Sequence, residues 1–235
     1  MAVTSAVAAV AVFFIIAAVR VSRKRTENQS EWDGWKMRIL VTAFEPFGGD
    51  GVNPTMEVLS RLQPREGLSR LVLPVTFQGA GAALTRAVET IRPDAVLSLG
   101  LAGGRDRITP ERVAINLDDA RIPDNDGLQP VDQPIVPGGP DAYFSTLPVR
   151  EIVRRIEALG IPAGLSLSAG TYVCNHVMYT ALHLAKTKYP GMRCGFVHVP
   201  YMDEMPHAEG KPSLPLADIV RAVEETVCAI AGEDA

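Results

Sequence analysis

Cys174 is the residue of this sequence whose position most favours chemistry. It lies in the stretch 168–179, which follows an apolar run at 163–167 that predicts a short buried strand. After Gly170 the apolar residues resume with helical spacing, so Cys174 is expected at the start of a helix. The unpaired N–H groups and the positive dipole end there favour a thiolate, which could act as a nucleophile. A small buried core cysteine is the alternative, and activation would need an adjacent base.

A histidine that could be this base lies further along the chain. His198 stands near the end of the apolar run 193–199, which predicts a strand. Enzymes with α/β folds place their sites at the carboxyl edge of the sheet. A neutral imidazole there could take the thiol proton and later return it to a leaving amine. A core histidine with satisfied hydrogen bonds remains the alternative.

A third group would have to orient that imidazole, as in a catalytic triad. Glu111 is the best candidate, because it stands at the mouth of the predicted strand 112–116. The competing Asp118, Asp119 and Asp124 each stand in a turn context that explains them without catalysis.

The composition bounds the class of protein. The chain has 235 residues, of which 47% are apolar, and this suits one large α/β domain or two small ones. The net charge is −4, and residues 37–235 contain no basic block, which argues against nucleic acid as a partner. The three cysteines, Cys174, Cys194 and Cys228, cannot all pair and match no zinc pattern. We therefore expect no metal and no cofactor, and free thiols in a reducing compartment, the cytoplasm.

Strands and helices alternate from Met37 onward. This alternation predicts an α/β fold, a three-layer αβα sandwich whose mixed sheet is mainly parallel, as in phosphorylases and hydrolases. The predicted strands are 38–44, 71–77, 95–99, 112–116 and 193–199. Helices are predicted from Pro54, with Asn53 as its cap, and over 78–91, 148–159, 171–182 and 216–230, and a long loop over 118–141.

The first 36 residues differ from the rest of the chain. Residues 2–19 are almost wholly apolar and would form a helix of about 27 Å, just short of a bilayer core. Basic residues follow within 20–25 and none precede, which does not fit a secretory signal and would keep the next domain cytoplasmic. Residues 1–36 are thus either a membrane tether or the product of a start codon placed too far upstream. Residues 37–235 form the expected catalytic domain.

Five ordered motifs carry a resemblance to a known family. Together they resemble pyroglutamyl-peptidase I, the pyrrolidone-carboxylate peptidases, which are cysteine peptidases. The resemblance runs from Met37 to about Ile230 and is specific. The motifs are 44–49 with 52–54, 110–116, 119–125, 168–175 and 196–201.

The resemblance implies an omega peptidase that removes N-terminal pyroglutamate from peptides through a Cys-His-Glu triad and a thioester intermediate. Cys174 matches the nucleophile, His198 the base and Glu111 the orienting group. Arg121 matches an arginine that supports the developing oxyanion. The resemblance also implies a homodimer or homotetramer. The implied substrate-binding residues are Phe44, Phe47, Asn53, Leu101, Ile122, Tyr172 and Val173.

The implied pocket suits its substrate. A pyroglutamyl residue has no free α-amine, so apolar walls and neutral hydrogen-bonding groups suffice, and Phe44 and Phe47 supply flat faces for its ring. An ordinary N-terminus would leave its charge unpaired there. Leu101 stands where many members have glutamine, and Tyr172 where many have phenylalanine. These departures put affinity in doubt more than activity.

Two other classes of function stay open. A binding module could capture blocked N-termini, although the joint presence of Cys174, His198 and Glu111 argues against it. A nucleoside-phosphorylase-like enzyme could use a similar sheet. It would need a basic phosphate site, for which only Arg105 and Arg121 are candidates, and the stretch 100–105 lacks the spacing of a phosphate loop.

Overall fold

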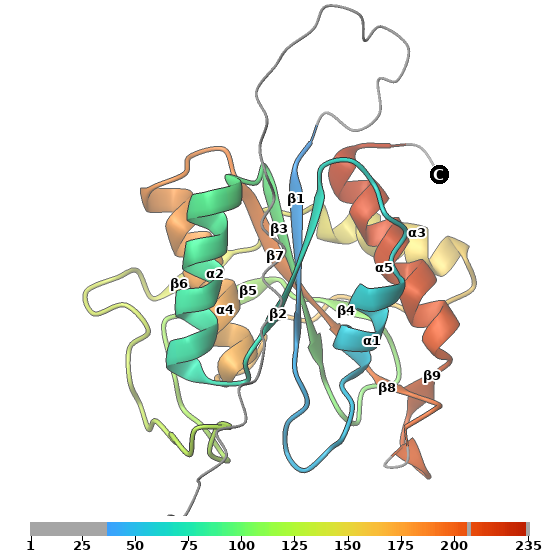
Figure 1. Ribbon diagram of the computed structural model, residues 1–235, viewed down its shortest axis with the longest axis horizontal. Coiled ribbons are helices and arrows are strands. Elements are labelled where there is room, and N and C mark those ends of the chain that lie inside the picture. Colours follow the sequence, from blue (N-terminus) through green and yellow to red (C-terminus); the bar gives the residue numbers. More distant parts are fainter. Residues whose placement is uncertain (1–36, 206–207, 234–235) are drawn as a thin grey trace, which may run out of the picture. The chain divides into compact units, whose positions relative to one another are not determined.

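A computed structural model describes residues 37–205 and 208–233, and within them a five-stranded sheet forms the middle of the fold (Figure 1). Four strands run parallel and the fifth, at one edge, runs antiparallel to its neighbour. The mainly parallel mixed sheet is thus confirmed. In spatial order the strands are β2 (Leu68–Leu73), β1 (Ile39–Phe44), β3 (Ala95–Leu101), β7 (Arg193–Val199) and β4 (Thr109–Pro110).

Helices cover both faces of this sheet, which confirms the three-layer αβα sandwich (Figure 1). One face packs against α2 (Phe77–Ile91) and α4 (Val173–Thr187). The other packs against α1 (Pro54–Arg61), α3 (Val149–Ala158) and α5 (Leu216–Ala231). All six residues of β1 are buried, as expected for a strand covered on both sides.

Polar side chains set where two of the helices begin. Asn53 Oδ1 accepts a hydrogen bond from the Thr55 amide at 3.0 Å, and Pro54 occupies the start of α1, as predicted. The Thr76 hydroxyl accepts from the Gly79 amide at 3.2 Å and caps α2. The predicted strand 71–77 is therefore wrong at its end. β2 stops at Leu73 because Pro74 has no N–H for the ladder.

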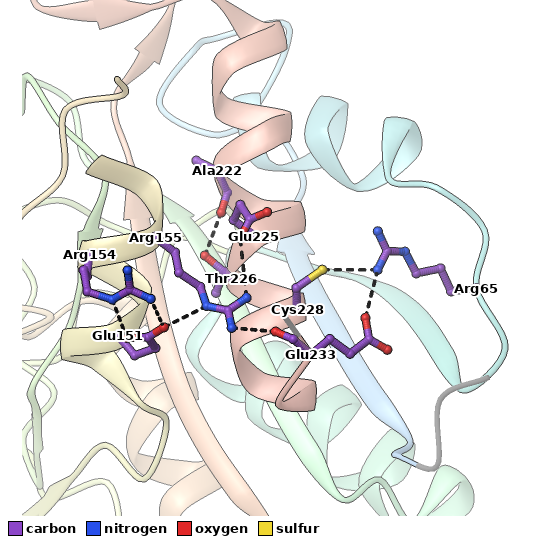
Figure 2. Close-up of polar contacts among 9 residues, drawn as sticks. All are labelled: Arg65, Glu151, Arg154, Arg155, Ala222, Glu225, Thr226, Cys228 and Glu233. Atoms are coloured by element: carbon purple, nitrogen blue, oxygen red, sulfur yellow. Dashed lines mark hydrogen bonds and ion pairs between the residues drawn. The ribbon is translucent and has the colours of Figure 1, made fainter. Parts of the chain in front are cut away.

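A half-buried arginine, Arg155, joins α3 to α5 (Figure 2). Arg155 Nε lies 2.9 Å from Glu151 Oε1 on its own helix, and Arg155 Nη1 lies 3.7 Å from Glu225 Oε2 on α5. On the outer side of α5, the Cys228 sulfur accepts from Arg65 Nη1 at 3.3 Å. These contacts account for Cys228 without catalysis.

The predicted buried strand 163–167 is wrong. Only isolated parallel bridges form, between Ala163 and Ile108 and between Ser166 and Glu111, and Leu167 is 77% exposed. The segment is apolar because its first residue packs in the core, not because a full strand is buried. It still runs alongside Glu111 and so covers that residue.

Short elements and the long loop complete the described fold. The predicted loop is confirmed over most of its length, from Asp118 to the start of β6. The predicted strand 112–116 forms β5 (Val113–Ile115), which pairs with β6 (Ala142–Phe144) outside the main sheet. A second small sheet pairs β8 (Tyr201–Met202) with β9 (Ser213–Leu214). β6, β8 and β9 were not expected, since strands this short carry little periodicity.

The membrane question concerns residues 2–19, which lie outside the described residues. In the part of the chain that the structure describes, no helix has the length and apolar character needed to cross a bilayer.

Candidate active site

The carboxyl ends of β1, β3 and β7 open into one cavity of about 710 Å³. Sheet register places His198 of β7 beside Gly100 of β3 and Thr109 of β4. The start of α4 supplies Cys174 to the same cavity. Ten of the eleven predicted site residues line it, namely Phe44, Phe47, Asn53, Leu101, Arg121, Ile122, Tyr172, Val173, Cys174 and His198.

Cys174 is the second residue of α4, as its sequence position predicts. No side chain caps this helix, so the amide groups of its first turn have no capping acceptor. The thiol reaches the end of β3 because residue 100 is glycine. A Cβ at Gly100 would lie 2.9 Å from Cys174 Sγ and 2.7 Å from the Phe196 ring.

Glu111 and His198 form a buried pair behind the cavity wall. His198 Nδ1 lies 2.7 Å from Glu111 Oε1, and the two residues are 4% and 0% exposed. A carboxylate oxygen can only accept, so the imidazole carries its proton on Nδ1. Nε2 is left as the basic nitrogen available to the cavity. Glu111 is the one predicted site residue that does not line the cavity. It contacts the site through its hydrogen bond with His198.

The aspartates that competed for this role are engaged elsewhere. Asp118 Oδ2 lies 2.8 Å from His176 Nδ1, so these two form a separate pair. Asp124 accepts from the Phe77 amide at 2.9 Å at the start of α2. Asp119 is exposed at the cavity rim. Of the four candidate carboxylates, Glu111 is the one that contacts His198.

Burial acts on the pKa of all three residues, Cys174, His198 and Glu111, together with nearby charges and hydrogen bonds. Burial lowers the pKa of His198, although Glu111 opposes the effect. Burial also disfavours charge on Glu111, but the contact with His198 and hydrogen bonds from Ser166 and Arg105 outweigh it and hold the pKa of this carboxyl below its usual value. Burial, together with the charge of Glu111, raises the pKa of the Cys174 thiol to about 12. The start of the helix, which the sequence predicts to favour a thiolate, therefore does not lower this pKa, and the thiol needs a base to take its proton.

Sequence reasoning missed the role of Arg105. Its Nη1 donates to Glu111 Oε1 at 2.7 Å, whereas the sequence offered this arginine only as part of a phosphate site. Spacing alone gives no signal for the contact, because the chain must turn between residues 105 and 111. Val75 and Tyr201 also line the cavity and were missed.

The predicted substrate-binding residues line the cavity from separate parts of the chain. Phe44 at the end of β1 and Phe47 in the following loop form a first wall, and Ile122 and Tyr172 line the cavity from the long loop and the start of α4. Asn53 is 1% exposed and holds the first wall together, because its amide nitrogen donates to Glu45 O at 3.0 Å while its oxygen caps α1. One N–H of this side chain is left for a ligand.

The loop that carries Arg121 and Ile122 is pinned to that first wall. Asn125 Nδ2 donates to Pro46 O at 3.1 Å, and the Asn125 amide donates to Val75 O at 3.0 Å. The Tyr172 hydroxyl donates to Pro123 O at 3.0 Å. Arg121 itself is exposed and forms no ion pair with another described residue.

Comparison with known proteins decides the family. The family model described as pyroglutamyl peptidase matches residues 37–233. The chain belongs to the pyroglutamyl peptidase family. It is therefore a cysteine peptidase, a hydrolase. Within the described residues, no group of three or more side chains is arranged to hold a metal ion.

Relatives in this family match most of the chain. The pyrrolidone-carboxylate peptidase of Levilactobacillus brevis is 48% identical over 198 residues, which are 83% of this chain and 97% of the relative. Pyrrolidone-carboxylate peptidase 1 of Streptococcus pneumoniae is 49% identical over 201 residues, 83% of this chain and 92% of the relative. The crystal structure of pyroglutamyl peptidase I from Bacillus amyloliquefaciens has a TM-score of 0.80 and 43% identity, covering 83% of this chain and 95% of that one.

Proposed function

We propose that Cys174, His198 and Glu111 act as a catalytic triad that removes N-terminal pyroglutamate from peptides. The observation that carries this proposal is the 2.7 Å hydrogen bond between Glu111 Oε1 and His198 Nδ1, at the wall of a cavity that also receives Cys174. The names of the relatives, pyrrolidone-carboxylate peptidases, support the substrate class.

The proposed reaction passes through a thioester. His198 Nε2 takes the thiol proton while Cys174 Sγ attacks the carbonyl carbon of the pyroglutamyl residue. The first-turn amides of α4 and Arg121 stabilise the resulting oxyanion. The C–N bond then breaks, the leaving amine takes the proton from His198, and pyroglutamyl thioester remains. Water gives a proton to His198 and attacks the thioester, which releases pyroglutamate and restores the thiol.

The protonation states make the proton transfer part of the attack. A thiol whose pKa is raised to about 12 holds its proton at neutral pH, and the neutral His198 is ready to accept it. Imidazolium then forms beside the ionised Glu111, which stabilises it. In the proposed triad, the Cys174 thiolate therefore forms only when His198 takes the thiol proton during the attack.

The walls of the cavity suit an uncharged ring. Phe44, Phe47, Ile122 and Tyr172 offer apolar surface to the cavity. Leu101 and Val173 add further apolar surface. A lactam needs no counter-ion, whereas an ammonium group would lose its water without gaining a carboxylate partner at these walls.

One assay tests the proposal. We expect the protein to release a fluorophore from a pyroglutamyl amide and to leave the matching prolyl amide, which carries a charged amine, essentially intact. Iodoacetamide should abolish the release by alkylating Cys174. Equal hydrolysis of both amides, or release that survives alkylation, would contradict the proposal.

We further propose that residues 37–235 work without the first 36 residues. The family match begins at residue 37, and β1 begins two residues later. A chain shortened to start at Met37 should hydrolyse the pyroglutamyl amide with unchanged kcat/KM. A folded but inactive shortened chain would make the extension part of the catalytic unit.

The compartment and the assembly remain proposals as well. Cys174, Cys194 and Cys228 are all free thiols, which fits the reducing cytoplasm. The family resemblance favours a homodimer or a homotetramer. Light scattering on the purified protein should give a mass of two or four chains, and the mass of one chain would contradict that assembly.

A further inference from the structure

We propose that Arg105 is a positioning residue of this active site, which holds the Glu111 carboxylate in place for His198. The inference rests on the proposed triad. Glu111 Oε1 accepts from Arg105 Nη1 and from His198 Nδ1, each at 2.7 Å. A single carboxylate oxygen thus links the guanidinium to the imidazole, so Arg105 can act on the base through Glu111.

The turn over residues 102–105, which places Arg105 near the end of the sheet, passes close to Tyr201. The Arg105 amide donates to Ala102 O at 3.2 Å, which closes a turn through Gly103 and Gly104. A Cβ at Gly103 would lie 2.6 Å from the Tyr201 hydroxyl, and Gly104 has a φ of +90°. The glycine-rich stretch that lacks phosphate-loop spacing therefore has another use. It turns the chain so that an arginine returns to the end of the sheet.

A second contact fixes the guanidinium on the sheet. Arg105 Nη1 also donates to the Thr109 hydroxyl, and Thr109 is paired with His198 in the ladder between β4 and β7. The Arg105 side chain is 31% exposed and lines the cavity, while its guanidinium is hydrogen-bonded to Glu111 and Thr109. Arg105, Glu111 and His198 are therefore anchored to the same two strands.

Charge explains why an arginine stands here. Glu111 is 0% exposed, and a buried carboxylate needs a partner that stays charged. His198 cannot be that partner in the resting enzyme, because burial lowers its pKa and leaves it neutral. Of the described residues that pair with Glu111, Arg105 carries the permanent charge.

Arg105 and Glu111 act on His198 in opposite directions. The Arg105 charge lowers the pKa of His198, and the Glu111 contact raises it. The base works only when neutral, so activity falls as the pH drops through the pKa of His198. Loss of the arginine charge should move this acid limb to higher pH, and loss of the glutamate charge should move it lower. The other ionisable groups that line the cavity are Asp50, Asp119, Arg121, Tyr172, Cys174 and Tyr201.

The test is the pH profile of kcat/KM on a pyroglutamyl amide. Arg105→Met should lower kcat/KM on the order of ten- to a hundredfold, as expected for loss of a charge-assisted hydrogen bond to a buried carboxylate, and should raise the acid limb. Arg105→Lys should recover part of the rate and restore the acid limb. Arg107→Met is the matched control, because Arg107 is exposed and pairs with its neighbour Asp106.

A double-mutant cycle with Glu111→Gln separates positioning from general damage. If Arg105 acts through Glu111, Arg105→Met should cost little in the Glu111→Gln background, and the two losses should not add. Additive losses, or an acid limb that Arg105→Met leaves in place, would overturn the inference. If circular dichroism shows that Arg105→Met does not fold, the same cycle is run with Arg105→Lys. Additive losses in that cycle would again overturn the inference.

The same variants distinguish a failure of the Arg105 proposal from a failure of the proposed triad. If Arg105→Met behaves like Arg107→Met while Cys174→Ser and Glu111→Gln lose activity, the role of Arg105 is wrong and the triad stands. If Cys174→Ser and Glu111→Gln keep full activity, the proposed triad itself fails, and the role of Arg105 fails with it.

Discussion

The two sides of the cavity are held in different ways. On one side, His198 and Glu111 lie on or directly beside strands, fully buried, and the ladders of β3, β7 and β4 fix their positions. On the other side, Arg121 and Ile122 lie in a long loop and are exposed. His198 and Glu111 thus rest on sheet register, whereas Arg121 and Ile122 rest on the hydrogen bonds of the loop that carries them.

Asp124 stabilises the loop that carries Arg121 and Ile122 through hydrogen bonds with backbone amides. Its two oxygens accept from three backbone amides, those of Phe77 at 2.9 Å, Asp126 at 3.0 Å and Leu128 at 2.8 Å. One carboxylate therefore closes the loop on itself and ties it to the start of α2. Because residues 119–128 lie in no strand of the described sheets and are held by single hydrogen bonds, changes on this side should alter substrate binding more than the chemical step.

The largest effect should come from the nucleophile Cys174, which the start of α4 places beside the end of β3. Cys174→Ser should lower kcat on the order of 10⁴-fold or more, the scale of loss when a triad nucleophile is removed. Cys228→Ser is the matched control, since Cys228 contacts Arg65 on the outer side of α5, and its kcat/KM should not change. Steady-state assays with circular dichroism measure both, and similar activity in the two variants would refute the assignment.

The base and its partner should rank next. His198→Ala should cost on the order of a hundredfold or more in kcat, as loss of a general base does. Glu111→Gln should cost less, because it keeps the shape of the side chain and removes only orientation and charge. Both variants should leave KM nearly unchanged, as removal of a group that acts only in the transition state does. A larger loss for Asp118→Asn than for Glu111→Gln would show that the third member is misassigned.

The smallest effect, and the one that sharpens the contrast, should come from the loop side. Asp124→Ala should raise the KM for a pyroglutamyl amide by about tenfold, equivalent to about 1.4 kcal/mol, while kcat changes little. It should also lower Tm by several degrees, because it removes the hydrogen bond at the start of α2. Asp126→Ala, an exposed neighbour, is the control. A fall in kcat larger than the rise in KM would show that the two sides are not separate.

Much of the strand side could be predicted from the sequence. The start of α4 at Cys174 and the strand that carries His198 follow from apolar periodicity, and the choice of Glu111 follows from its place beside a predicted strand. The expected strand 163–167 is wrong because an apolar run looks the same whether it forms a ladder or only single bridges.

The remaining errors concern contacts between distant residues. The Arg105–Glu111 pair depends on a turn through Gly103 and Gly104, and sequence spacing does not reveal where that turn aims the side chain. The expected thiolate at Cys174 counted the helix dipole and not the burial, which raises the pKa of the thiol to about 12. Burial is a property of the packed fold, so local sequence could not supply it.

One measurement tests the central claim most directly, that Cys174 is the nucleophile facing a pyroglutamyl pocket. A pyroglutamyl chloromethyl ketone carries the recognised ring next to an alkylating carbon, so it marks the residue that attacks. Peptide mass mapping after inactivation should find one label per chain, on Cys174, and the prolyl analogue should react far more slowly. Inactivation accompanied by a label on Cys194, Cys228 or a histidine, with Cys174 unmodified, would contradict the account.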